Sequence, residues 1–199
     1  MTTAKLINAQ FGLYQNVEYR ITDKDGNAKR IFQENKLCRF LLQNGILSPL
    51  WINAKLGFLL RPFLGRYSDT RNIRNLVVNA GKAGMASRAN GAGAEAVFTY
   101  IAMGTGVVAA AATDTALGTE LAVSGLGRAN STASRVTTTV TNDTAQLQNT
   151  FTVTGSVALT ESGVLNAASV GTLLARQVFT AINVVNGDNL QVTWKFQFS

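Results

Sequence analysis

The sequence predicts a mainly β fold: an antiparallel β-sandwich of the jelly-roll or Ig-like kind, with an N-terminal hairpin and a small helical, irregular insertion. Apolar and polar residues alternate in several segments, most clearly in residues 190–198, and this period of two is typical of half-buried strands. Turn-forming pairs such as Asn186-Gly187 separate the segments. Apolar residues make up 46% of the 199 residues and charged residues 15%, so the chain can bury a core.

We expect three regions along the chain. Residues 1–35 form the hairpin segment, residues 36–94 a basic, apolar-rich docking region with short helices, and residues 95–199 the β-sandwich domain. Residues 1–90 carry 14 Lys and Arg against 5 Asp and Glu, whereas residues 91–199 carry 4 against 6. This uneven charge indicates either an acidic partner, nucleic acid or an acidic protein surface, or a solvent-exposed face that is basic without a partner.

The hairpin is predicted over residues 17–32. Val17, Tyr19 and Ile21 alternate with polar residues, and Asp25-Gly26-Asn27 supplies residues that tolerate a positive φ in a tight turn. The return strand is expected over residues 28–32.

The docking region begins with a helix predicted over residues 35–44, with Gly45 as its C-terminal cap. Residues 36–65 then carry many apolar side chains interrupted by glycine and proline, and short turns or strands are expected there. Apolar side chains interspersed with arginines suit a subunit interface, although burial in the chain's own core stays an open alternative. The interface candidates are Trp51, Phe58, Arg61, Phe63, Arg66, Tyr67, Arg71 and Arg74.

The middle of the chain joins this region to the sandwich. Residues 76–90 have helical spacing, weakened by two glycines, and residues 91–94 are a flexible connector. A strand over residues 97–103 leads through Gly104-Thr105-Gly106 into an arm of small residues, 107–112, and a turn at 113–115. An arm without bulky side chains is able to lie along a neighbouring subunit.

The second half is expected to supply the strands of the sandwich. They are predicted over residues 134–141, 146–154, 173–182 and 190–198, with a bend or short helix at 160–165 between them.

The sequence lacks most catalytic chemistry. It contains no histidine and a single cysteine, Cys38, so histidine-activated nucleophiles, disulfides and thiolate metal clusters are excluded within the chain. We predict no enzyme activity, no catalytic residues, no metal and no cofactor. Glu120 and Glu161 each follow a threonine beside apolar residues, and we expect these carboxylates to hold structure by binding backbone N–H groups of a turn or an arginine.

Several motifs of the second half form a recognisable set. They are Tyr100 to Gly106, 109–115, Leu117-Gly118-Thr119-Glu120, 151–154, 159–168, 171–176 and 192–194. As a set they resemble tailed-bacteriophage virion structural proteins, namely the attachment domains of tail-collar fibres and small phage structural proteins. The resemblance covers residues 75–199 and, loosely, 17–32; residues 36–74 have no counterpart in it.

The resemblance implies a non-enzymatic structural subunit of a tailed-phage virion, in the tail, neck or collar. The alternatives are a decoration or cement protein on the capsid surface and a glycan-binding receptor module. Expected partners are further copies of the chain and other virion proteins, such as tail, portal or neck, or major capsid proteins. Nucleic acid is disfavoured because the arginine-rich stretch 66–75 offers one aromatic residue, Tyr67, for stacking.

We expect the chain to be made in the host cytoplasm and to reside in the virion. Residues 1–10 lack the apolar core of a signal peptide. The apolar stretch 40–54 is too short and too polar for the ~20 residues of a membrane span.

Overall fold

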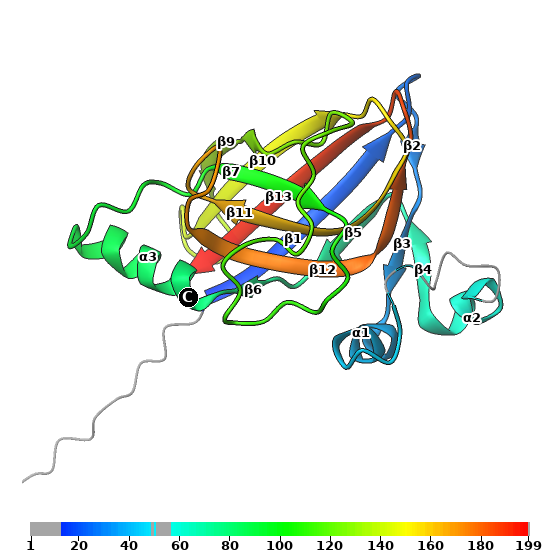
Figure 1. Ribbon diagram of the computed structural model, residues 1–199, viewed down its shortest axis with the longest axis horizontal. Helices are drawn as coiled ribbons and strands as arrows, with labels where there is room; N and C mark the ends of the chain where they lie inside the picture. Colours follow the sequence, from blue (N-terminus) through cyan, green and yellow to red (C-terminus); the bar gives the residue numbers. More distant parts are fainter. Residues whose placement is uncertain (1–12, 49, 51–56, 199) are drawn as a thin grey trace, which may run out of the picture.

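The computed structural model describes residues 13–48, 50 and 57–198. It contains 45% strand and 14% helix, and it is an antiparallel β-sandwich with a small helical insertion. The predicted fold class is confirmed. Figure 1 shows the two sheets as the body of the molecule, with α3 at one end and α1 and α2 together at the other.

The first sheet is built around the N-terminal strand. Its order is β2-β1-β13-β10-β9, and β5 also pairs with β1. These strands are β1 (Leu13–Thr22), β2 (Ala28–Lys29), β5 (Thr70–Ile73), β9 (Thr132–Val136), β10 (Thr144–Thr152) and β13 (Asn189–Phe198). Strand β1 pairs with β13 along its whole length, from Leu13 opposite Phe198 to Thr22 opposite Asn189.

The second sheet packs against the first and has the order β6-β12-β11-β7-β8. Its strands are β6 (Leu76–Val77), β7 (Tyr100–Gly104), β8 (Ala129–Asn130), β11 (Val157–Leu165) and β12 (Leu173–Val184). The longest contact within it joins β11 and β12, with irregular register after Leu159 and after Val164.

The main core fills the space between the sheets. The inward residues of β13 are Leu190, Val192, Trp194 and Phe196, all buried, and they confirm the predicted alternation. A hydrogen bond of 2.6 Å between Tyr19 Oη and Ser162 Oγ crosses the core from β1 to β11. Burial raises the pKa of the Tyr19 hydroxyl well above its ordinary value, more than the bond to Ser162 lowers it. The two sheets are therefore joined by a polar contact as well as by apolar packing.

The insertion extends from a separate two-stranded sheet. Strands β3 (Ile31–Glu34) and β4 (Gly65–Ser68) pair with each other and carry α1 (Lys36–Gln43) and α2 (Gly57–Leu64) at their ends. The predicted helix near 35–44 is confirmed, because Asn35 Oδ1 accepts the Cys38 N–H at 2.9 Å at its start and Gly45 has φ +68° after its end. Helix α2 was not predicted.

Helix α3 (Asn79–Asn90) packs on β12 through its glycines. A Cβ on Gly81 would lie 2.1 Å from the carbonyl oxygen of Leu174, and a Cβ on Gly84 would lie 2.6 Å from the Phe98 ring. The two glycines that weakened the helix prediction therefore allow its close approach to the sandwich.

The structure corrects one expectation about a strand. Residues 160–165 form part of the continuous strand β11 instead of a bend or short helix. Strand β1 lies inside the first sheet, and β5 and β6 pair with β1 and β12, so strand pairing does not follow the boundaries expected at residues 35 and 94. Within residues 13–48, 50 and 57–198, no helix has both the length and the apolar character needed to span a membrane.

Candidate functional site

The segment 105–121 crosses the outer face of the second sheet instead of extending away from the molecule. Figure 1 shows this loop in green in front of β11 and β12. The Asn79 N–H donates to the carbonyl of Ala112 at 2.8 Å, and the Thr160 hydroxyl donates to the carbonyl of Gly106 at 2.8 Å. In this fold the arm 107–112 lies on its own sheet, and Val108 is exposed on it.

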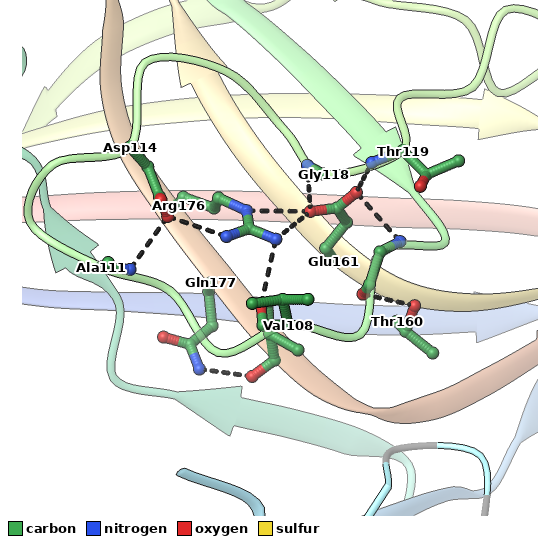
Figure 2. Close-up of polar contacts among 11 residues, drawn as sticks. Val108, Ala111, Asp114, Gly118, Thr119, Thr160, Glu161, Arg176 and Gln177 are labelled. Atoms are coloured by element: carbon green, nitrogen blue, oxygen red, sulfur yellow. Dashed lines mark hydrogen bonds and ion pairs between the residues drawn. The ribbon is translucent and has the colours of Figure 1, made fainter. Parts of the chain in front are cut away.

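Glu161 holds the two ends of this segment together (Figure 2). Its carboxylate is fully buried and accepts the backbone N–H groups of Gly106 at 3.0 Å, Gly118 at 2.9 Å and Thr119 at 2.6 Å. Arg176 on β12 donates to the same carboxylate through Nε at 2.9 Å. A buried carboxylate with this many donors organises the backbone around it.

Arg176 extends the cluster to the turn at 113–115. Its Nη1 donates to Asp114 Oδ2 at 2.7 Å, and its Nη2 donates to the carbonyl of Val108 at 3.1 Å. Although burial lowers it, the hydrogen bonds to Asp114 and Glu161 raise the pKa of the Arg176 guanidinium above its ordinary value. The cluster is thus a network of ion pairs and hydrogen bonds that binds the arm to β11 and β12.

Glycines around Glu161 give the segment room to pack closely. A Cβ on either Gly104 or Gly106 would lie 2.5 Å from Glu161 Oε1, and a Cβ on Gly163 would lie 2.6 Å from Cδ1 of Leu117. The structure therefore brings together two motifs that lie apart in the sequence, 104–120 and 159–168. Sequence reasoning did not assign a role to Gly163.

Glu120 makes a second, more exposed cluster. Arg128 donates to both of its carboxylate oxygens, at 2.8 and 2.7 Å, and to the carbonyls of Ala167 and Val170 at 2.9 and 2.7 Å. The contacts expected of Glu120 and Glu161, with turn backbone or with arginine, are confirmed.

A third cluster lies at the base of the insertion. Arg71 on β5 is fully buried, and it donates to Glu34 Oε1 at 2.5 Å and to the carbonyl of Thr180 at 2.6 Å. Its guanidinium carbon lies 5.2 Å from the centre of the Phe179 ring. Arg71 was an interface candidate, and this assignment is wrong for the fold described, because the side chain has no surface to offer a partner.

The insertion exposes a set of large apolar side chains, which we call the insertion face. Phe63 is 71% exposed, Ile46 63% and Phe40 56%. The full set is Leu37, Phe40, Ile46, Leu50, Leu60 and Phe63. Beneath them, Phe32, Cys38 and Leu64 form a small core separate from the main one. Within this set only Phe63 was an interface candidate. The other five are among the many apolar side chains noted over residues 36–65.

The remaining interface candidates have different positions. Arg66 and Arg74 are exposed, and Tyr67 is partly exposed with its ring edge against Phe32. Phe58 and Arg61 are part of α2, where their side chains lie outside the described part of the chain. Trp51 also lies outside the described residues.

The chemistry available in these clusters is structural. The Glu161 carboxylate is occupied by backbone and arginine donors, and burial raises the pKa of the Cys38 thiol to about 12, which keeps it protonated and unreactive. In the described ranges of the chain no three His, Cys, Asp or Glu side chains gather as metal ligands would.

Comparisons with protein-family models, with curated proteins and with solved structures found no match for this chain.

Proposed function

We propose that the chain is a non-enzymatic structural subunit of a larger protein assembly, which works through subunit contacts made by its insertion. On the strength of the sequence resemblance, that assembly is a tailed-phage virion, with the tail, neck or collar as the station. The subunit joins further copies of itself and other virion proteins.

The observation that carries the proposal is the insertion face. Six large apolar side chains are exposed on one projection of about thirty residues, which has only a small core of its own. Exposed apolar patches of this kind mark interaction surfaces, because leaving them in water is unfavourable. Exposed Arg66 beside them fits the mixed apolar and basic character of an interface.

The charged clusters support a structural role over a catalytic one. General acid–base work needs a carboxylate that can exchange a proton with a substrate. Glu161 is fully buried under the segment 105–121 and bound to Arg176, while Asp114 is bound to the same arginine. These groups stabilise the fold and leave the insertion to make contacts.

The oligomeric state of the purified full chain tests the proposal. We expect sedimentation velocity to show a concentration-dependent oligomer, and the double variant Phe40→Ser/Phe63→Ser to be monomeric at the same concentrations. The matched control is Val108→Ser/Val140→Ser, which changes two exposed apolar side chains away from the insertion face. A wild-type chain that stays monomeric, or an oligomer dissociated equally by both double variants, would contradict the proposal.

The number of copies per virion tests where in the particle the subunit is located. A tail, neck or collar subunit is present in a few to a few dozen copies per virion, whereas a head-surface decoration protein is present in hundreds. Quantitative mass spectrometry of intact particles, with imaging of the labelled subunit, separates the two.

A further inference from the structure

A cavity lined by both polar and apolar residues lies between the insertion and the sandwich. It encloses about 330 Å³ and is lined by Arg39 of α1, by Arg74 and Asn75 before β6, by Ala109 of the arm and by Phe179 of β12. Glu34, at the end of β3, also lines it. Elements far apart in the sequence therefore build its walls, and Glu34 among them is paired with buried Arg71.

A second cavity of about 380 Å³ shares two lining residues with the first and is also lined by residues of β1, β5, β10 and β13 of the first sheet. Arg39 and Arg74 line both cavities, and Lys195 of β13 lines the second. We call the two together the basic channel.

The basic channel carries an uncompensated positive charge. Arg39, Arg74 and Lys195 form no ion pair within the described residues. Its one lining carboxylate, Glu34, is already paired with buried Arg71. Three cations facing a concave surface attract an anionic ligand, and the attraction is stronger than on a flat surface because water is partly excluded.

Three residues that line the channel carry buried polar atoms without hydrogen-bond partners in the described chain. Asn75 Nδ2 and Oδ1, Arg39 Nε and Glu34 Oε2 have no hydrogen bond in the described chain, and Glu34 is 4% exposed. A buried polar group left without a partner is unfavourable by about 1–3 kcal/mol. The Asn75 amide offers an NH2 donor group and a carbonyl acceptor, which complement the C=O and the N–H of a peptide group.

We propose that the basic channel binds an acidic peptide segment of a partner protein, with its carboxylates between Arg39 and Arg74 and its backbone on the Asn75 amide. Glu34 Oε2 then accepts a backbone N–H of that segment. Arginine clusters recognise acidic motifs in this manner, through charge-assisted hydrogen bonds. The inference rests on the proposed structural role, since it names the chemistry of a partner that the insertion face leaves unspecified.

The lining disfavours two other anionic ligands. Bases of single-stranded nucleic acid stack on exposed aromatic side chains, and rings of sugars pack on similar platforms. Phe179 is the aromatic residue among the lining residues of both cavities, and it is fully buried. A peptide needs no such platform.

Calorimetric titration with synthetic oligomers tests the inference. The probes are acetylated hexaglutamate amide, hexaglutamine of the same length, hexagalacturonate and hexathymidylate, each added to the full-length chain. We expect hexaglutamate to bind and hexaglutamine not to bind. The variant Arg39→Gln/Arg74→Gln should raise the Kd for hexaglutamate at least about tenfold, which corresponds to 1.4 kcal/mol.

The matched control is Lys82→Gln/Arg135→Gln, which lowers the net charge equally at exposed positions away from the channel. It should change the Kd less than threefold. Asn75→Leu should weaken hexaglutamate binding without any change of charge, and thermal unfolding verifies that each variant is folded. If Asn75→Leu does not fold, the arginine pair alone decides, since Arg74 is exposed and Arg39 partly exposed.

Three results would overturn the inference. They are no binding of hexaglutamate, equal weakening by the channel and control variants, and tighter channel-dependent binding of hexagalacturonate or hexathymidylate than of hexaglutamate.

Failure of this inference and failure of the proposed function give different results. A chain that binds hexaglutamate but never self-associates through the insertion face contradicts the assembly role alone, and an oligomer without hexaglutamate binding contradicts the channel alone.

Discussion

At the scale of single residues, Glu161 is the group whose loss we expect to matter most. It is fully buried, and Arg176 and the N–H of Thr119 donate to its carboxylate. Glu161→Gln replaces one acceptor oxygen by an NH2 group that points at donors and leaves the Arg176 charge without its buried partner. Breaking such a pair costs about 3–5 kcal/mol. We expect a loss of this size in urea denaturation of the full-length chain.

Glu120→Gln is the matched control for this prediction. The same chemical change removes the charge that faces Arg128, but the Glu120 side chain is 28% exposed. Because water reaches this pair more than the fully buried Glu161–Arg176 pair, we expect a smaller loss, nearer the value of about 1 kcal/mol for surface pairs. Equal losses for the two variants would contradict the role assigned to the buried cluster.

Cys38 gives a prediction about pH. Its pKa is raised by burial from 9.0 to about 12 in the folded chain. Because the unfolded thiol loses its proton first, the contribution of Cys38 to stability is complete below pH 9 and declines as the pH rises from 9 towards 12. We expect iodoacetamide at pH 8 to label the folded chain much more slowly than the urea-unfolded chain. Equal rates would show that the small core around Cys38 is open.

The residues whose roles sequence reasoning missed share one property: their partners are remote in the sequence. Arg71 is one of three arginines in residues 66–75, a pattern that indicates an exposed basic surface, yet Glu34 and Thr180 enclose it. Glu161 could be assigned to structure because the threonine before it and the nearby arginines indicated a bound carboxylate. Which backbone groups it binds depends on the path of the segment 105–121, and no local pattern encodes that path.

At the scale of elements, Gly81 sets the distance between α3 and β12. Gly81→Ala would gain about 1 kcal/mol of helix propensity, but its Cβ would lie 2.1 Å from the Leu174 carbonyl oxygen, which is backbone and cannot rotate away. Overpacking of this kind costs about 1–3 kcal/mol. We expect a net loss of stability in thermal unfolding, with the helix displaced from the sheet.

Lys82→Ala controls for this prediction, since Lys82 is the exposed neighbour of Gly81 on the same helix. Alanine there meets no backbone, so the change in stability should stay within about 0.5 kcal/mol. A stabilising Gly81→Ala would show that α3 can move away from β12 without loss of packing.

The elements that sequence reasoning predicted well are those whose pattern is local. Strand β13 alternates apolar and polar residues over its length, and only one side faces the core. Residues 160–165 of β11 were predicted as a bend or short helix, and Glu161 and Gly163 among them are poor strand formers. Glu161, Ser162 and Gly163 are buried, and each is accommodated by a remote residue: Arg176, Tyr19 and Leu117 respectively. Helix α2 was missed because it contains Pro62, which normally interrupts a helix.

At the scale of the whole molecule, the sandwich and the insertion have separate cores. The main cluster draws its buried residues from 17–31 and 73–196, and none comes from α1 or α2. The insertion is joined to the sandwich through β3, β4 and the Glu34–Arg71 pair. The insertion face thus lies on a part of the molecule that contributes no residue of α1 or α2 to the main core.

This separation predicts that the sandwich folds without the insertion. The N–H of Asn35 donates to the carbonyl of Leu64 at 2.8 Å, so the two ends of the insertion already meet. Replacing residues 36–63 by a short Gly-Ser linker should leave the near-ultraviolet circular dichroism of Trp194, which lies in the main core, close to that of the full chain. The change exposes part of the Glu34–Arg71 pair, so we expect a lower melting temperature, and self-association should be lost. The control keeps the full length and carries Phe40→Ser/Phe63→Ser, which removes the adhesive side chains but preserves the cover over Arg71. A shortened chain that is unfolded would show that the sandwich depends on the insertion, and one that still associates would place the contacts elsewhere.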